Sequence, residues 1–203
     1  METLHEMVIA IPDSFLAWPN NCGFELLLSN EMRRDLIKSG SIYDSLNHRA
    51  YKVDNENNPA GFFTYYNSNV DCGNYIQFKL LDFEGSTVVQ IIKFYGEACC
   101  TDTRISFLAF ENGKWIDHSK EIMPSINYGH FLNSESQDCS KYKGERPAVI
   151  LSPGEEENQL ICEIDIESIE YEVEGDDCAF DLDNYERREI VLNYFDDRYS
   201  IAQ

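Results

Sequence analysis

Short runs rich in Phe, Tyr, Ile and Val recur through most of the chain, separated by clusters of Gly, Asn, Asp and Pro. Such runs are typical of β-strands, because β-branched and aromatic side chains pack well on a pleated surface and the separating residues favour turns. The pattern predicts strands at 60–66, 74–82, 87–95, 104–111, 114–117, 148–152, 159–173 and 188–195. We therefore expect a mostly antiparallel sheet or sandwich.

Two dipeptides between apolar runs predict hairpin turns. Asn112-Gly113 favours a type I′ turn, in which both central residues take positive φ. Asp196-Asp197 stands in the same position between two apolar runs near the C-terminus. The sequence therefore predicts strands joined as hairpins.

Helix signals gather near the N-terminus, between residues 13 and 40. Asn30 can cap a helix over Glu31–Lys38, and Gly40 is suited to end it. The expected fold is β-rich α+β, with a short helical portion packed on the sheet. A length of 203 residues fits one domain over 1–203, with a helical or irregular portion at 1–58 and a β-rich portion at 59–203.

The negative charge is concentrated in the last third of the chain. Residues 155–197 hold 17 acidic residues and two arginines, giving a formal charge of −15 out of −21 for the whole chain. This charge argues against a nucleic-acid binder, which must neutralise phosphates, and favours a basic partner. No apolar run approaches the roughly 20 residues that span a bilayer.

Acidic and apolar residues alternate within this region. The alternation holds over 162–167, and its phase shifts near Ser168 so that Glu170, Glu172 and Glu174 share one parity. A period of two predicts a sheet with a carboxylate outer face, and the shift predicts a bulge or a turn. Such a face can serve solubility, or it can dock a basic protein by steering its approach.

Its compact size, acidity and lack of enzyme motifs are characteristic of an immunity protein or inhibitor. We expect a non-enzymatic protein that covers the active site of a basic bacterial toxin or enzyme, with no cofactor, metal site or catalytic residue. The partner-binding residues expected are acidic: Glu155, Glu156, Glu157, Glu170, Glu172, Glu174, Asp176, Asp177, Asp181 and Asp183. The alternative is an exported module that binds a small ligand, or calcium and carbohydrate.

The run Val88–Pro124 resembles a pattern in uncharacterised, often exported bacterial proteins. In that pattern a strand leads to a Gly/Cys loop, then to an aromatic-ended strand, an Asn-Gly or Asp-Gly turn and Lys-Trp. The resemblance implies a β-rich architecture and attaches no catalytic residue. The chain differs by doubling the cysteine at Cys99-Cys100 and by lacking an export signal. As written, the chain is expected to be cytoplasmic, whereas removal of a signal would place it in the periplasm or outside the cell.

The residue types bear on three kinds of chemical site: a thiol site, a calcium site and a zinc site. Cys99 or Cys100 with Asp117-His118 could form a thiol, base and carboxylate set, although the acidic background opposes a thiolate. The segment 176–184 is acidic enough for calcium but fails the EF-hand pattern. Seven cysteines without a Cys-x-x-Cys pair fit buried thiols in a reducing compartment better than zinc, with one or two disulfides as the alternative in an exported protein.

Overall fold

The computed structural model describes residues 3–17, 28–45, 49–53, 62–67, 75–97, 100–132, 147, 149–156, 158–164 and 188–202. These residues form a seven-stranded and a four-stranded antiparallel sheet together with short helices. The expected β-rich α+β class is confirmed.

The seven-stranded sheet is a meander in which each strand pairs with its neighbour in sequence. Its strands, in spatial order, are β1 (Ser41–Asp44), β2 (Arg49–Val53), β3 (Phe62–Asn67), β4 (Tyr75–Phe83), β5 (Ser86–Glu97), β6 (Cys100–Glu111) and β7 (Lys114–Asp117). The strand predictions from 60 to 117 are confirmed with shifts of a few residues at their ends. The sequence did not predict β1 and β2, which are short.

The four-stranded sheet has the order β11-β10-β9-β8 and is also a meander. Its strands are β8 (Val149–Pro153), β9 (Gln159–Ile164), β10 (Glu189–Phe195) and β11 (Arg198–Ile201). The prediction at 159–173 is confirmed as far as Ile164. Its remainder, and the bulge or turn predicted near Ser168, lie outside the described residues.

Both predicted hairpin turns are present. Asn112 has φ 50° and Gly113 has φ 80°, while Asp196 and Asp197 have φ 48° and 65°. The Asp-Asp turn places two residues with a Cβ in this left-handed region, where such residues are disfavoured, whereas Asn-Gly places only one there. A third turn of this kind, between β4 and β5, was not predicted.

Four α-helices and one 3-10 helix complete the described secondary structure: α1 (Leu4–Ala10), α2 (Asp13–Leu16), α3 (Asn30–Ser39), α4 (Ser119–Ile122) and η1 (Tyr128–His130). The helix predicted at 31–38 is α3, and Gly40 ends it with φ 75° as expected. The predicted cap was wrong by one residue, because the hydroxyl of Ser29 accepts the bond from Met32 N–H. The side chain of Asn30 instead donates to the carbonyl of Ile9 at 2.6 Å.

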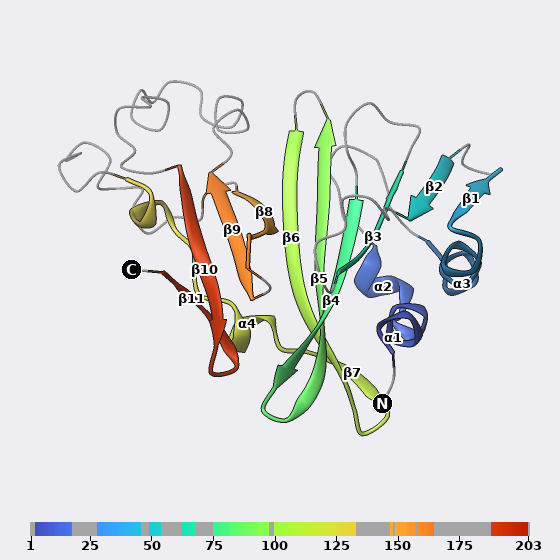
Figure 1. The fold of residues 1–203 in the computed structure, drawn as a ribbon, viewed down its shortest axis with the longest axis horizontal. Helices are drawn as coiled ribbons and strands as arrows, with labels where there is room; N and C mark the ends of the chain where they lie inside the picture. Colours follow the sequence, from blue (N-terminus) through green and yellow to red (C-terminus); the bar gives the residue numbers. More distant parts are fainter. Residues whose placement is uncertain are drawn as a thin grey trace.

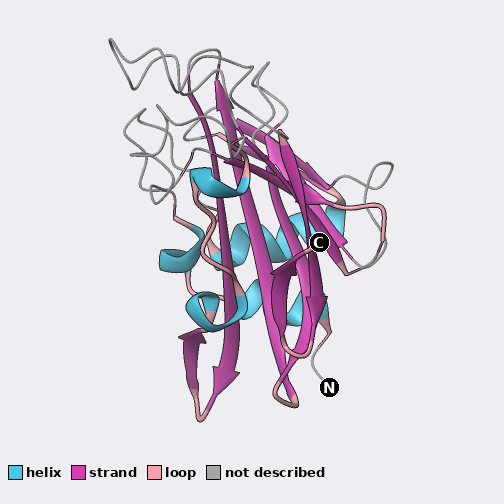
Figure 2. Cartoon of the chain, turned by 90° about the vertical axis from the view of Figure 1, so that its left-hand side faces the viewer, coloured by secondary structure: helices cyan, strands magenta, loops and turns pink. Residues whose placement is uncertain are grey.

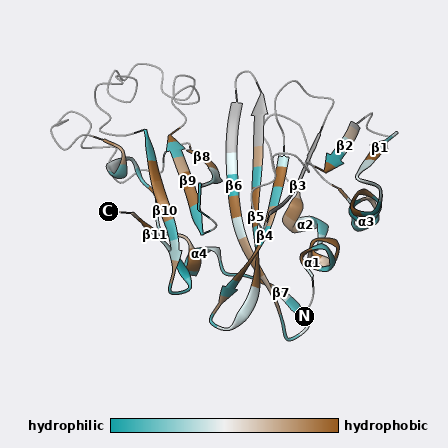
Figure 3. Cartoon of the chain, viewed as in Figure 1, coloured by the Kyte–Doolittle hydropathy of each residue, from teal (hydrophilic) through white to brown (hydrophobic). Residues whose placement is uncertain are grey.

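The two faces of the large sheet carry different layers. Helices α1 to α3 cover one face and the small sheet covers the other, as Figure 1 shows from the side. Figure 2 looks from the small sheet toward the large one. Figure 3 shows hydrophobic stretches on both sheets and on α1 and α3. Because both faces of β4, β5 and β6 are covered, residues of both parities are buried there.

A buried arginine joins the N-terminal helices. Arg33 on α3 is 1% exposed, and its guanidinium donates to the carbonyls of Val8, Ile9, Ile11 and Leu28. It also pairs with Asp13 at 2.7 Å. Position 12 is proline, which has no N–H, so the helix cannot supply the i+4 donor for the carbonyl of residue 8. Arg33 therefore satisfies the C-terminal end of α1 by side-chain donors.

Candidate functional site

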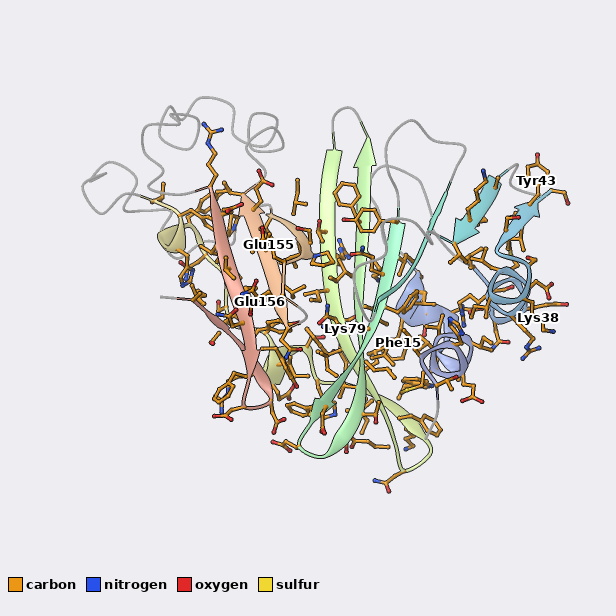
Figure 4. The ribbon with its side chains drawn as sticks, in the orientation of Figure 1. Phe15, Lys38, Tyr43, Lys79, Glu155 and Glu156 are labelled. Carbon is orange, nitrogen blue, oxygen red and sulfur yellow. The ribbon has the colours of Figure 1, made fainter. Side chains whose placement is uncertain are left out.

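Two of the ten acidic residues predicted to bind a partner lie among the described residues. Glu155 and Glu156 are exposed in the connection between β8 and β9, and both are labelled in Figure 4. The other eight fall outside the described residues: Glu157, Glu170, Glu172, Glu174, Asp176, Asp177, Asp181 and Asp183. The geometry of the site is therefore built outward from Glu155 and Glu156.

The β8–β9 connection lies beside the end of β10. Gln159 N–H donates to the Glu156 carbonyl at 3.1 Å, and Tyr194 N–H donates to the Asn158 carbonyl at 2.8 Å. Asn193 pairs with Gln159 in the sheet register. Because β10 ends here and turns into β11, the carboxylates of the Asp196-Asp197 turn lie at the same end of the small sheet.

Tyr194 connects this end to the large sheet. Its hydroxyl donates to the carbonyl of Asp82, close to the β4–β5 turn that contains Glu84. Burial raises the pKa of Tyr194 to about 12, with smaller contributions from the charges of Asp197 and Asp82. The turns of β4–β5 and β10–β11 point toward the same end of the molecule in Figure 1.

We call this group the carboxylate end. It comprises Asp82, Glu84, Glu155, Glu156, Asp196 and Asp197, all exposed except Asp197, which is half-buried. Sequence reasoning missed Asp82 and Glu84 because they lie more than 70 residues before Glu155 and reach it only through the packing of the two sheets.

An exposed aromatic ring lies within the carboxylate end. Phe195 is 72% exposed and lies between Tyr194 and Asp196, while Arg198 supplies a positive charge beside it. Aromatic residues are enriched among those that dominate binding energy at protein interfaces, and surrounding charges steer the approach of a partner. The exposed ring of Phe195 beside the Asp196-Asp197 turn, at the end of the sheet that also carries Glu155 and Glu156, forms a surface suited to a basic protein.

A second acidic site lies at the other end of the small sheet. Glu163 on β9 and Glu189 on β10 are exposed and directly opposite in the register. Like charges placed opposite each other destabilise a sheet. The connection from β9 to β10 leaves from this end, and residues 165–187 contain ten acids and one arginine.

The acidic residues predicted to dock a partner therefore belong to two connections of the small sheet, one between β8 and β9 and one between β9 and β10. Along β9, the start of the strand beside Glu156 is roughly 17 Å from its end at Ile164, at a rise of about 3.3 Å per residue. The β8–β9 connection and the β9–β10 connection therefore begin at opposite ends of the sheet. Charge variants at each end can separate their roles.

The thiol, base and carboxylate set is not assembled by the described residues. Asp117 accepts from Ser119 N–H at 2.9 Å, whereas His118 pairs with Glu111 at 3.1 Å. His118 N–H binds the carbonyl of Phe107, seven residues along β6 from Cys100. That separation is roughly 23 Å along an extended strand. Cys99 lies outside the described residues.

The described residues offer neither a metal site nor a membrane-spanning helix. Among the described residues, no group of three or more His, Cys, Asp or Glu side chains could hold a metal ion. The acidic segment 176–184, considered for calcium, lies outside them. No helix in the described ranges is long and apolar enough to cross a membrane.

Comparison with known proteins adds one structural likeness. No protein-family model matches the chain. No curated protein matches it either. A solved structure of a domain of an uncharacterized protein from Porphyromonas gingivalis W83 is similar, with a TM-score of 0.63 at 17% sequence identity. The similarity covers 96% of each chain and shows a shared fold.

Proposed function

We propose that this protein binds a basic protein and inhibits it, as an immunity protein does for a toxin. The observation that carries the proposal is the carboxylate end, where three turns from two sheets bring acidic side chains to one end of the molecule and Phe195 is exposed beside one of these turns. In this proposal the carboxylates pair with Lys and Arg around the partner's active site, and the chain itself performs no chemistry.

The charge distribution of the whole chain supports the same proposal. A formal charge of −21 repels nucleic acids and accelerates encounter with a cationic surface. Exposed ion pairs contribute about 0.2–1 kcal/mol each, so charges of this kind act mainly on the association rate and on specificity. An anchor such as Phe195 is needed to hold the complex once it forms.

The test begins with affinity capture from the native lysate at low salt, with elution by a salt gradient and identification by mass spectrometry. A basic protein released by salt is the expected result. Its binding is then measured for the double variant Asp196→Asn/Asp197→Asn, which removes two charges while Asn tolerates positive φ. We expect affinity to fall roughly 2- to 30-fold at low salt, with a shallower salt dependence.

A matched control removes the same charge at the opposite end of the small sheet. Glu163→Gln/Glu189→Gln also removes two carboxylates, and it leaves the carboxylate end intact. Equal losses in both variants would mean that net charge alone matters. A third variant, Glu170→Lys/Glu172→Lys/Glu174→Lys, reverses charges within the 165–187 segment. A loss of affinity confined to the control or to this third variant would assign the docking surface to that segment. Unchanged binding by all three variants at low salt would refute acidic docking.

A further inference from the structure

Several polar side chains are buried on the face of the large sheet that the small sheet covers. Gln77 and Lys79 on β4 are 8% and 3% exposed, Gln90 on β5 is 0% exposed and Thr103 on β6 is 2% exposed. Each shares strand parity with residues that pack against the small sheet, such as Leu81, Ile92 and Phe107. They therefore lie on the covered face, where an unpaired polar atom is costly.

The register brings two amides close together. Lys79 is directly opposite Gln90, and Gln77 is directly opposite Ile92. Gln77 and Gln90 are therefore diagonal neighbours, with Cα atoms roughly 7–8 Å apart. Figure 4 labels Lys79 near the centre of the large sheet.

A tyrosine from the small sheet fixes the orientation of one amide. The Tyr199 hydroxyl on β11 donates to Gln90 Oε1 at 2.7 Å. Burial raises the pKa of Tyr199, so the hydroxyl keeps its proton at neutral pH. With its oxygen bound to Tyr199, the amide keeps only its donor Nε2, which is buried, for another partner.

The two amides then offer one donor and one acceptor that the described residues do not use. Neither Gln90 Nε2 nor Gln77 Oε1 has a hydrogen-bond partner among them, and both atoms are buried. Leaving a buried polar atom unsatisfied destabilises the fold, so native proteins nearly always supply a partner. A molecule that binds both atoms must accept a hydrogen bond from Gln90 Nε2 and donate one to Gln77 Oε1.

Aromatic rings lie next to the amides on the same face. Tyr75 and Phe94 stack with ring centroids 4.8 Å apart and planes 12° apart. Tyr75 is two residues before Gln77, and both rings are half-buried whereas Gln90 is fully buried. Exposure therefore increases from Gln90 through Gln77 to the stacked rings, which marks the direction from which a molecule would enter.

We propose that Gln77 and Gln90 bind a small polyhydroxylated ligand of the sugar class between the sheets. Each hydroxyl of a sugar both donates and accepts, which matches Gln90 Nε2 and Gln77 Oε1. A few fixed polar groups beside aromatic and apolar side chains are typical of small-molecule sites. This proposal does not depend on the carboxylate end, and its test is separate from that of the proposed function.

The experiment measures thermal unfolding of the full chain with increasing glucose, galactose, mannose or N-acetylglucosamine. Sugars stabilise proteins generally as osmolytes, with no saturation, whereas a bound sugar gives a saturable rise in Tm. At 100 times Kd, that rise is roughly 5–11 °C for a chain of this size. We expect a saturable rise with at least one of the four sugars.

The variant Gln77→Met removes the acceptor and is expected to abolish the saturable rise. Gln159→Met makes the same substitution on β9, where the residue is half-buried outside the intersheet core, and is expected to keep it. A second measurement avoids dependence on the variant's folding. In NMR titration of the wild-type chain, the side-chain amide signals of Gln77 and Gln90 should shift while that of Gln159 should not.

Two results would overturn the proposal. One is the absence of a saturable rise with all four sugars, which would leave the amides bridged by water. The other is an equal saturable rise in wild type and Gln77→Met, or an NMR titration in which neither Gln77 nor Gln90 responds.

Discussion

Replacing Arg33 with methionine should destabilise the protein more than any surface change described above. The substitution keeps a long side chain in the buried position but removes the donors to the carbonyls of Val8, Ile11 and Leu28, while Asn30 still donates to Ile9. The carbonyls of Val8, Ile11 and Leu28 belong to residues that are 0–1% exposed, so water cannot readily replace the guanidinium. The loss therefore resembles breaking a buried charged network by removing one partner.

The magnitude follows from these contacts. Each buried carbonyl left without a donor costs about 1–3 kcal/mol, and partial rearrangement limits the sum, so we expect a loss of roughly 3–5 kcal/mol. For a chain of this size, that loss lowers Tm by roughly 6–20 °C. Urea unfolding followed by far-ultraviolet circular dichroism gives the free energy, and thermal scans give Tm.

Two further variants show whether the carbonyls carry the effect. Asp13→Asn leaves the carbonyl bonds in place and removes only an ion pair with a carboxylate that is 42% exposed, so it should cost under about 1 kcal/mol. Arg33→Lys keeps the charge but reaches fewer carbonyls, so its loss should be intermediate. A loss below about 1 kcal/mol for Arg33→Met, or an equal loss for Asp13→Asn, would refute the reasoning.

Two other predictions concern the small sheet. The folded-state pKa of Tyr194 is about 12 against 10 when unfolded, so its stabilisation is complete below pH 10 and is lost as pH rises from 10 to about 12. Urea unfolding across this range should show that Tyr194→Phe flattens the decline, and an unchanged pH dependence would contradict the assignment. Glu163 and Glu189 form a like-charge pair, which Glu163→Lys turns into a pair of opposite charges. This variant should therefore raise the free energy of unfolding by roughly 0.2–1 kcal/mol at low salt. The gain should shrink in 1 M salt, where screening is strong, and a gain independent of salt would exclude an electrostatic cause.

The sequence predicted best the elements whose signals are local. Strands β4 to β7 follow from apolar runs, and the φ values of Asn112-Gly113 and Asp196-Asp197 follow from turn chemistry. Helix α1 was not predicted, although Thr3 and Glu6 form a capping box that could have marked its start. Strand β1 has only four residues, too few for a clear alternation.

The candidate sites depend on contacts that no local pattern contains. Alternation along β4 assigns Gln77 and Lys79 to a polar, solvent-facing side, but the small sheet covers that side and buries them. Local charge identified Glu155 and Glu156, whereas Asp82 joins them only because the Tyr194 hydroxyl reaches its carbonyl. A sequence window cannot anticipate which distant strands will pack together.

The two meanders have a consequence for the order of folding. Every strand pair within either sheet joins neighbours in sequence, so both sheets form largely through local loops with small closure entropy, the long connection over 165–188 between β9 and β10 excepted. The contacts between sheets are distant, with Tyr199 to Gln90 spanning 109 residues and Tyr194 to Asp82 spanning 112. We therefore expect secondary structure to develop early and the slow step to be the docking of the C-terminal hairpin. Until that hairpin docks, the polar face of β4 and β5 remains hydrated, and its amides lose their water last.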